Sequence, residues 1–217
     1  MKDFIAFLSK NQAEVLRAFG QHIWLVVISV GIGFIIALPA GIILSRHKRA
    51  AKYIIAFTGT LQTIPSLVLL GLARLLFGIG ALPAIMVLAI YAILPILRNT
   101  YTGIDEVDPS YVEAARGIGM TDAQVLMQVE LPLAIASIVG GLRMSVIYII
   151  SWATLAGLIG AGGLGDLIWT GLGTYSRHHI YAGAIPAALL ALIASFLIGL
   201  LQNALTPRGI RREASAK

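Results

Sequence analysis

Five long apolar runs divide the chain, and each is long enough to cross a lipid bilayer as a helix. A spanning helix needs about 20 consecutive, mostly apolar residues. The runs cover residues 23–44, 53–73, 75–97, 133–159 and 180–206. The run 133–159 contains one charged residue, an arginine, and the other runs contain none. This pattern predicts an all-α integral membrane protein with five transmembrane helices.

The third run is the least regular. Gly78, Gly80, Pro83 and Pro95 interrupt it, and proline removes a backbone donor from a helix. We therefore expect a shorter helix with an irregular start, whose freed backbone groups are satisfied by neighbouring helices.

The first 22 residues differ from the apolar runs because charged and apolar positions are mixed. A secretory signal peptide would instead have a basic tip, an uninterrupted apolar core and a small-residue cleavage site. The apolar positions are Phe4, Ile5, Phe7, Leu8, Val15, Leu16 and Phe19. We expect an amphipathic interfacial helix over residues 1–22; a solvated tail is the alternative.

Basic residues at the ends of the runs predict the orientation. The segments 45–52 and 208–217 hold most of them: Arg46, Lys48, Arg49, Lys52, Arg208, Arg211, Arg212 and Lys217. With five spans, both segments lie on the same side as the polar segment 98–132. Basic flanks mark the cytoplasmic side, so we expect the N-terminus outside and the C-terminus inside.

The composition supports one membrane domain. Hydrophobic residues make up 58% of the chain and charged residues 12%, against about 25% charged in soluble domains. We assign residues 23–207 to this domain and 208–217 to a basic cytoplasmic tail. Cysteine is absent, which excludes Cys-ligated metal and redox sites. The net charge of +6 comes from basic residues beside apolar runs, so lipid rather than nucleic acid is the expected partner.

The polar segment 98–132 contains two helix-start signals. Asp108-Pro109 pairs an N-cap residue with proline at the first helical position, and Gly117 or Gly119 can end that helix. Thr121 and Gln124 fit a capping box. We expect two short helices joined by a glycine turn, with the second running to the start of the next span. Because the side chains of Ala114 and Ala115 are small, they would leave a surface against which another protein could pack closely.

This segment resembles the signature of permease subunits of type I ABC importers. The signature is Glu-Ala-Ala, three residues, Gly, nine residues, Ile or Val, one residue, Leu-Pro. The matching residues are Glu113, Ala114, Ala115, Gly119, Val129, Leu131 and Pro132. The resemblance implies that the segment docks on an ATP-hydrolysing subunit, with Arg116, Gly117 and Met120 in the same coupling region.

Further stretches resemble the osmoprotectant branch of this family, which imports glycine betaine, carnitine or choline. They are residues 63–66, 81–85, 94–104, 107–109, 159–168 and 182–190. The glycine-rich part of 159–168 is shared with methionine-type importers, so an amino-acid importer is the alternative within the class. A channel or scaffold not coupled to ATP is the alternative outside it, although neither would need the coupling signature.

The resemblance also implies the partners. They are two ATPase subunits, a second identical or similar permease, and an extracytoplasmic substrate-binding protein, at a bacterial or archaeal cell membrane. This chain has no phosphate-binding loop of the G-x-x-x-x-G-K-[ST] type, so ATP and Mg²⁺ belong to the partner. We expect a transport subunit without cofactors of its own, not an enzyme.

Candidates for lining a translocation path are polar or aromatic residues within the spans. They are Gln62, Thr63, Pro65, Ser66, Arg143, Tyr148, Ser151, Trp152 and Thr154. Hydrogen bonding between helices explains most of them equally well. For Arg143, a functional role and snorkelling to the interface both remain open.

Residues 160–165 satisfy the dinucleotide fingerprint G-x-G-x-x-G, but that motif requires a strand before it and a helix after it. Here it follows a predicted span, so we expect a tight outer turn built on Gly160, Gly162, Gly163 and Gly165. His178-His179 has no third ligand nearby, and we expect a solvated loop there without metal. The tryptophans Trp24, Trp152 and Trp169 form no cluster in the sequence, so we expect ligand recognition mainly in a separate receptor.

Overall fold

In the computed structural model, described for residues 2–207, helices form almost the whole chain and no strand occurs within that range. The helices are α1 (Lys2–Lys10), α2 (Gln12–Arg46), α3 (Lys48–Thr63), α4 (Ser66–Phe77), α5 (Ala81–Asp105), α6 (Pro109–Gly117), α7 (Asp122–Val125), α8 (Leu131–Ala156), α9 (Leu164–Gly173) and α10 (Arg177–Leu205). A π-helical turn, Leu126–Glu130, precedes α8, and a 3-10 turn, Gly157–Ile159, follows it. The tail 208–217 lies outside the described residues.

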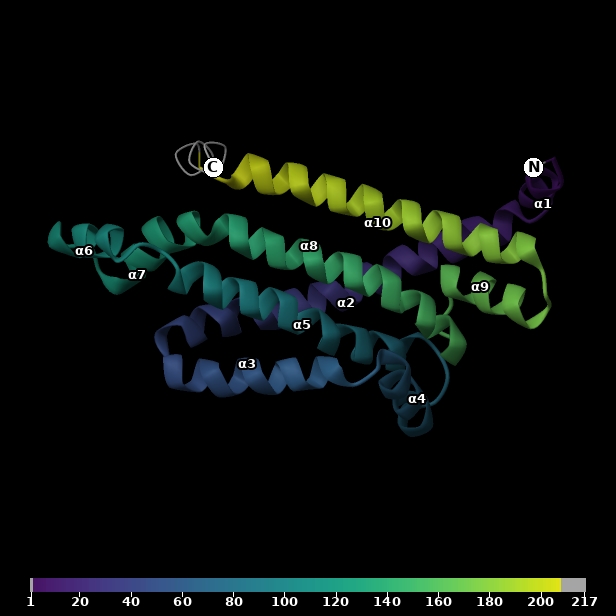
Figure 1. Ribbon diagram of the computed structural model, residues 1–217, viewed down its shortest axis with the longest axis horizontal. Helices are drawn as coiled ribbons and strands as arrows, with labels where there is room; N and C mark the ends of the chain where they lie inside the picture. The colour runs from purple at the N-terminus through teal and green to yellow at the C-terminus, as the bar shows by residue number, and fades with distance from the viewer. Residues whose placement is uncertain (1, 208–217) are drawn as a thin grey trace.

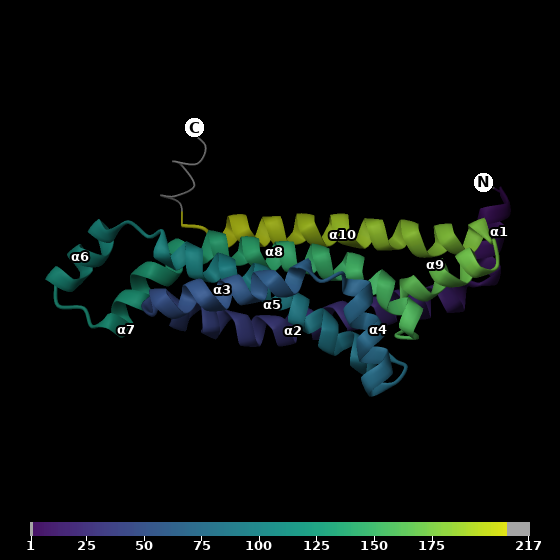
Figure 2. The same cartoon turned by 60° about the horizontal axis from the view of Figure 1, so that its bottom comes forward.

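The long helices α2, α5, α8 and α10 run along the longest axis of the molecule (Figure 1). Helix α5 packs against both α2 and α8, and α10 packs against α8 and α9. The corner between α2 and α3, the helices α6 and α7, and the last turn of α10 gather at one end, while α1 and α9 lie at the other (Figures 1 and 2). We call the first of these ends the polar end.

Within residues 2–207, four helices are long and apolar enough to span a membrane: α2, α5, the continuous helix Asp122–Ile159 and α10. The predicted second span was wrong in one respect, because residues 53–73 do not form one straight helix. Helices α3 and α4 meet at an angle of 87° and make a fifth span only if they are counted together. Pro65 explains the break, since proline disfavours a helical residue before it, and Ile64 is extended with ψ at 126°.

The irregular start of the third apolar run is confirmed. Gly78 and Gly80 have φ values of 87° and 132°, which bulkier residues rarely adopt, and α5 begins only at Ala81. Pro95 remains inside α5. Its carbonyl accepts a bond from the Asn99 side chain at 2.8 Å.

Several glycines allow the helices to approach closely, as expected for packing in lipid. A methyl group placed on Gly33 would lie 2.7 Å from Cβ of Ala92, where α2 crosses α5. The same change at Gly141 of α8 would bring it within 2.7 Å of the Pro95 carbonyl oxygen on α5. Other glycines within the spans, such as Gly59, have open space around them.

The N-terminal helix α1 packs on the protein rather than extending away from it. Phe4 and Phe7 stack on His178, with ring centroids 6.3 and 5.6 Å apart, and Phe7 also meets His179 edge-on. The expectation of a solvated loop at His178-His179 was therefore wrong. Both histidines lie in the first turn of α10, where the phenylalanine rings cover them.

Candidate functional site

The polar end presents α6 with a defined start and stop. The Asp108 side chain accepts a bond from the Ser110 N–H at 2.8 Å, which lowers the pKa of the Asp108 carboxyl below its usual range. At the other end, Gly119 has φ at 87° and donates to the Arg116 carbonyl, while Met120 donates to the Ala115 carbonyl. These two bonds form a Schellman motif, so Gly119 is the residue that ends the helix.

The predicted capping box at the next helix is confirmed. The Thr121 N–H donates to the Gln124 side chain at 2.8 Å, and the Gln124 N–H donates to the Thr121 hydroxyl at 3.4 Å. Arg116 also forms an ion pair with Asp122 at 3.0 Å, which ties the end of α6 to the start of α7. The turn between the two helices is therefore ordered by local bonds.

The second helix is not a separate short helix, contrary to expectation. Helix α7 continues through the π turn into α8 without a break. Pro132 does not interrupt this path, because it lies in the first turn of α8, where a missing N–H is tolerated. The Leu131 N–H reaches back to the Leu126 carbonyl, which is the wide bond spacing of a π helix. Helix α8 thus extends directly to the exposed turn.

The signature residues divide into exposed and buried groups. Glu113, Ala114, Arg116, Gly117 and Gly119 are exposed, and Met120 is half-buried. Ala115 is only 5% exposed, so its predicted place on a docking surface was wrong. It lies on the covered side of α6, which packs on α7 and the π turn. Leu131 packs below them against Ile104, Ala134 and Ile138, and Pro132 beside it is half-buried.

Three large apolar residues at this end were not among the predicted site residues. They are Tyr111, Ile118 and Met127, of which Ile118 is 78% exposed. Their positions in a polar segment between two spans were the available signal, since exposed apolar side chains in such a place often mark a protein contact.

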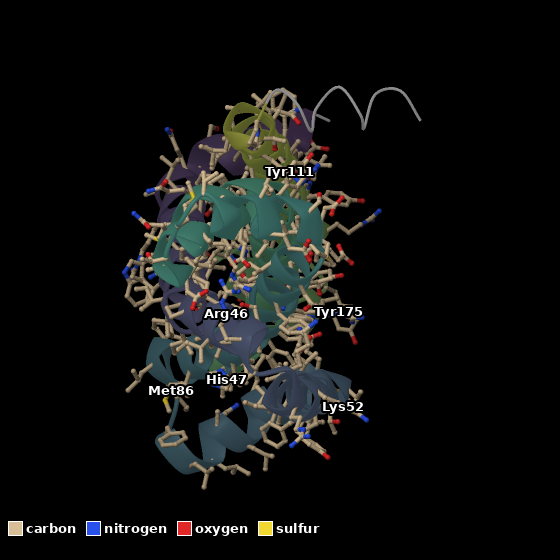
Figure 3. The ribbon with its side chains drawn as sticks, turned by 90° about the vertical axis from the view of Figure 1, so that its left-hand side faces the viewer. Arg46, His47, Lys52, Met86, Tyr111 and Tyr175 are labelled. Atoms are coloured by element: carbon tan, nitrogen blue, oxygen red, sulfur yellow. The ribbon has the colours of Figure 1, made fainter. Side chains whose placement is uncertain are left out.

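Beneath α6, charged residues from distant parts of the chain meet. Arg46, the last residue of α2, holds the Glu130 carboxylate with both of its Nη atoms, one of them at 2.9 Å from Oε1. Lys48 pairs with Asp105 at 2.7 Å. With Glu113, these residues line an open cavity of about 380 Å³. A view along the bundle from this end shows Arg46 near the centre, with Tyr111 and Lys52 toward opposite edges (Figure 3).

Among the path candidates at the helix break, Gln62 bonds to Tyr91 of α5. The Gln62 side chain donates to the Tyr91 carbonyl at 3.3 Å, and the Tyr91 hydroxyl donates to the Ile64 carbonyl at 2.6 Å. The neighbouring Thr63 hydroxyl donates to the Thr60 carbonyl within its own helix. Pro65 and Ser66 form the turn itself, at the start of α4.

Among the path candidates on α8, Trp152 contacts the same tyrosine. The Trp152 ring lies 4.7 Å from the Tyr91 ring and 5.5 Å from the Tyr148 ring, measured between centroids. Ser151 and Thr154 donate to carbonyls of their own helix, those of Ile147 and Ser151. The structure therefore connects Gln62 with Trp152 through Tyr91, which lies within an apolar run and was not singled out.

Arg143 is separate from this group. Its Nε and Nη2 atoms donate to the Ser195 hydroxyl of α10 at 3.0 and 2.8 Å, and its guanidinium passes beside Gly199. It faces α10 rather than the aromatic residues. A role for Arg143 in a path stays a prediction.

The glycine-rich segment forms a tight turn at the opposite end, as predicted. Gly160, Gly162 and Gly163 all have positive φ, between 74° and 83°. Gly165, which was also predicted to lie in the turn, is the second residue of α9 instead, and a Cβ there would overlap the Thr154 carbonyl oxygen. The preceding element is α8 and its 3-10 turn rather than a strand, so the dinucleotide interpretation is not supported.

This turn borders a second open cavity, of about 470 Å³, whose polar lining includes Glu14, Arg17, Gln21 and Asp166. The Gly163 N–H donates to the Gln21 side chain at 3.2 Å. Burial raises the pKa of the Asp166 carboxyl above its usual range. Among residues 2–207, no group of His, Asp and Glu side chains is placed to hold a metal ion.

Solved structures share this fold. The methionine ABC transporter MetNI, in an inward-facing conformation, contains a chain that superposes with a TM-score of 0.80 at 23% identity, covering 90% of this chain and 98% of that one. A chain of an amino acid ABC transporter with histidines gives a TM-score of 0.76 at 24% identity, covering 93% and 98%. These likenesses establish an all-helical membrane permease fold.

Curated relatives are closer in sequence. The glycine betaine/carnitine/choline transport system permease protein OpuCB of Bacillus subtilis (strain 168) is 44% identical over 97% of each chain. The choline transport system permease protein OpuBB of the same organism is 44% identical over 98% of each chain. The osmoprotectant import permease protein OsmW of Salmonella typhimurium (strain LT2) is 42% identical over 96% of this chain and 100% of that one.

The family model described as "binding-protein-dependent transport system inner membrane component" matches residues 29–211. That match covers most of the chain, including α6, α7 and all the path candidates. The protein is a multi-pass inner-membrane permease component rather than a catalytic subunit, and it belongs to the family of binding-protein-dependent transport system inner membrane components.

Proposed function

We propose that this chain is the permease subunit of an ATP-driven importer for a compatible solute: glycine betaine, carnitine, choline or a similar quaternary amine. The observation that carries the proposal is 44% identity, over 97% of each chain, to a permease named for these three solutes. Permeases named for choline and for osmoprotectants lie within the same range of identity.

The polar end faces the cytoplasm in this proposal, with the N-terminus outside. It carries Arg46, Lys48, Arg49 and Lys52, and α10, which precedes the basic residues of the tail in the sequence, ends there. Basic flanks are typical of the cytoplasmic side. The turn 160–165 and its cavity would then face the substrate-binding protein.

The exposed part of α6 and its turn docks on the ATPase subunits. Glu113, Ala114, Arg116, Gly117 and Gly119 are exposed there. A helix closed by a Schellman motif and an ion pair presents these groups in one fixed arrangement, which favours a specific contact. Because α7 runs continuously into α8, a movement of the turn would be transmitted directly to a helix that carries path candidates.

A second permease, identical or similar, completes the path. Helix α10 packs on α8 and α9, but only Ala182, Gly183 and Ala187 of its 29 residues are buried within this chain. Of the path candidates on α8, Tyr148 and Ser151 are exposed, and Arg143, Trp152 and Thr154 are half-buried. Both observations favour a pathway formed between two permeases. ATP and Mg²⁺ would bind to the ATPase subunits.

The amino-acid importer alternative is weaker. It rests on likenesses of 23–24% identity, which carry the fold alone. The alternative of a channel or scaffold independent of ATP is also weaker, because the chain belongs to a family of binding-protein-dependent transport components.

The test of coupling is transport by the complete complex in proteoliposomes, with the variants Glu113→Ala and Gly119→Ala. We expect import and receptor-stimulated ATP hydrolysis to fall together by roughly 5- to 150-fold, the usual range of a coupling free energy between sites. Glu106→Ala is the matched control, because Glu106 is an exposed acid just before the signature. Normal coupling in the Glu113 and Gly119 variants would contradict the docking assignment.

The test of substrate uses the unmutated complex with its own receptor. Radiolabelled glycine betaine, carnitine and choline should accumulate in an ATP-dependent way, and methionine should not. Accumulation of an amino acid in place of all three would overturn the substrate assignment.

A further inference from the structure

Three aromatic rings from two helices form one cluster beside the helix break. Trp152 of α8 lies between Tyr91 of α5 and Tyr148 of α8, at centroid distances of 4.7 and 5.5 Å and interplanar angles of 53° and 36°. Tyr91 is 2% exposed and forms the floor of the cluster, whereas Tyr148 is 39% exposed. Trp152 is half-buried between them.

The floor of this cluster is fixed in position. The Tyr91 hydroxyl is bonded to the Ile64 carbonyl, and its backbone carbonyl accepts from Gln62. The tyrosine therefore cannot turn without breaking its bond to the α3–α4 break. A ring held in this way is preorganised, so little rotamer entropy is lost when a ligand contacts its neighbours.

The hydroxyl groups of three nearby polar residues on α3 and α8 donate to backbone carbonyls of their own helices. Ser151 donates to Ile147, Thr154 to Ser151, and Thr63 to Thr60. These three hydroxyls are thus engaged within their own helices, and the ring faces of Tyr148 and Trp152 are the groups left to contact a solute. Ring faces suit a cation that carries methyl groups in place of N–H bonds.

The cluster opens on the side of α8 that this chain leaves uncovered. Met144, Tyr148 and Ser151 are exposed, and their spacing of four and three residues places them on one helix face. Figure 1 shows α8 in the front layer with α2 behind it, and α10 and α5 on either side. A solute moving between this permease and a second one would pass along that face.

We propose that Tyr148 and Trp152, supported from below by Tyr91, form a contact site for the trimethylammonium group of the solute within the permease. The inference rests on the proposed quaternary-amine substrate. A cation over the face of a tryptophan or tyrosine is attracted by the ring quadrupole, most strongly by tryptophan. The site contacts the solute from one side only, which suits a transport site that must release the solute again.

The test compares Tyr148→Leu with Tyr148→Phe in the complete complex in proteoliposomes. Import of glycine betaine and ATP hydrolysis are measured together, at saturating receptor and solute, and expressed as molecules imported per ATP. Loss of one partly exposed ring should lower this ratio roughly two- to fivefold, while phenylalanine, which keeps the ring, should preserve it. Tyr53→Leu is the control, since Tyr53 is an exposed tyrosine on α3, outside the cluster.

Each outcome bears on the proposal. A lower ratio in Tyr148→Leu, with Tyr148→Phe and Tyr53→Leu near the unmutated value, supports the site. An unchanged ratio in Tyr148→Leu overturns it, and so does an equal fall in both Tyr148 variants, because the ring would then be irrelevant. If the unmutated complex imports no quaternary amine at all, the substrate assignment fails first and this site fails with it.

Trp152 provides a second variant of the same kind. Trp152→Phe keeps a smaller ring and should lower the ratio by less than Trp152→Leu. Recovery of the assembled complex by size-exclusion chromatography separates this effect from a failure to fold, because Trp152 also packs against the buried core. A normal ratio in correctly assembled Trp152→Leu would overturn the site independently of Tyr148.

Discussion

Arg46 and Glu130 lie 84 positions apart in the chain, yet they form a bidentate ion pair at the polar end. Arg46 ends α2 and Glu130 ends the π turn that leads into α8. The Glu130 side chain is 6% exposed and that of Arg46 38%. The pair therefore joins the first long helix to the joint between the exposed turn and α8, with its acidic half buried.

This unequal burial predicts an unequal response to mutation. Arg46→Met would leave a buried carboxylate without its partner and should destabilise the protein by about 3 kcal/mol. Glu130→Gln would leave an arginine that can turn toward water, so the loss should be nearer about 1 kcal/mol. Thermal unfolding of the purified permease in detergent measures both.

The double variant Arg46→Met/Glu130→Met is the control. It removes both charges together and should be more stable than Arg46→Met alone. Equal destabilisation by the two single variants would show that the burial difference has no energetic consequence.

Tyr91→Phe should loosen the break between α3 and α4. The variant removes one hydroxyl, and with it the donor to the Ile64 carbonyl, at a cost of about 0.5–1.5 kcal/mol. Hydrogen exchange of residues 60–68 should become faster while the rest of the bundle keeps its protection. Tyr53→Phe, which removes an exposed hydroxyl from α3, serves as the control. Unchanged exchange around Ile64 in Tyr91→Phe would refute the role of this bond.

The sequence was most informative where structure depends on near neighbours. Asp108, Gly119, Thr121 and Gln124 act through bonds to residues at most a few positions away, so the start and end of α6 and the capping box could be predicted. Four of the five apolar runs, all except 53–73, likewise predicted the long helices, because the bilayer sets their length.

Features that depend on tertiary packing were missed. The pairing of Arg46 with Glu130 joins residues that no local pattern connects, and the meeting of Tyr91 with Trp152 depends on how α5 crosses α8. Ala115 matched a motif whose spacing does not reveal which face of α6 is covered. The break at Pro65 was visible in the sequence, but the apolar run around it favoured a continuous span.

The cap at Asp108 predicts a pH dependence for α6. Its carboxylate accepts from the Ser110 N–H, and this bond lowers the pKa of the group below its ordinary value of 3.8. A lowered pKa in the folded state means that the stabilisation is present above the ordinary value and is lost as the pH falls through the lowered one. Hydrogen exchange at the start of α6, corrected for its intrinsic pH dependence, should show constant protection from pH 8 to about pH 5 and a loss below about pH 4.

Two variants separate this effect from general acid unfolding. Asp108→Asn keeps an oxygen acceptor and should retain the cap without the pH dependence, whereas Asp108→Ala should weaken the start of α6 at every pH. Identical pH profiles for the unmutated protein and Asp108→Asn would show that this carboxylate is not responsible.

Gly141→Ala should show how closely α8 must approach α5. The added methyl group would lie 2.6 Å from Cβ of Asn99 and 2.7 Å from the Pro95 carbonyl oxygen. Because one of these atoms belongs to the backbone, the helices must move apart, and overpacking of this kind costs about 1–3 kcal/mol. Gly59→Ala is the matched control, since nothing lies within 4 Å of a methyl group there, and alanine favours the helix over glycine. We expect a lower midpoint of thermal unfolding for Gly141→Ala and an equal or higher one for Gly59→Ala. The reverse order would mean that the contact between α5 and α8 adjusts without strain. A movement that begins at the polar end would then be taken up at this contact and would not reach the face of α8 that carries Tyr148.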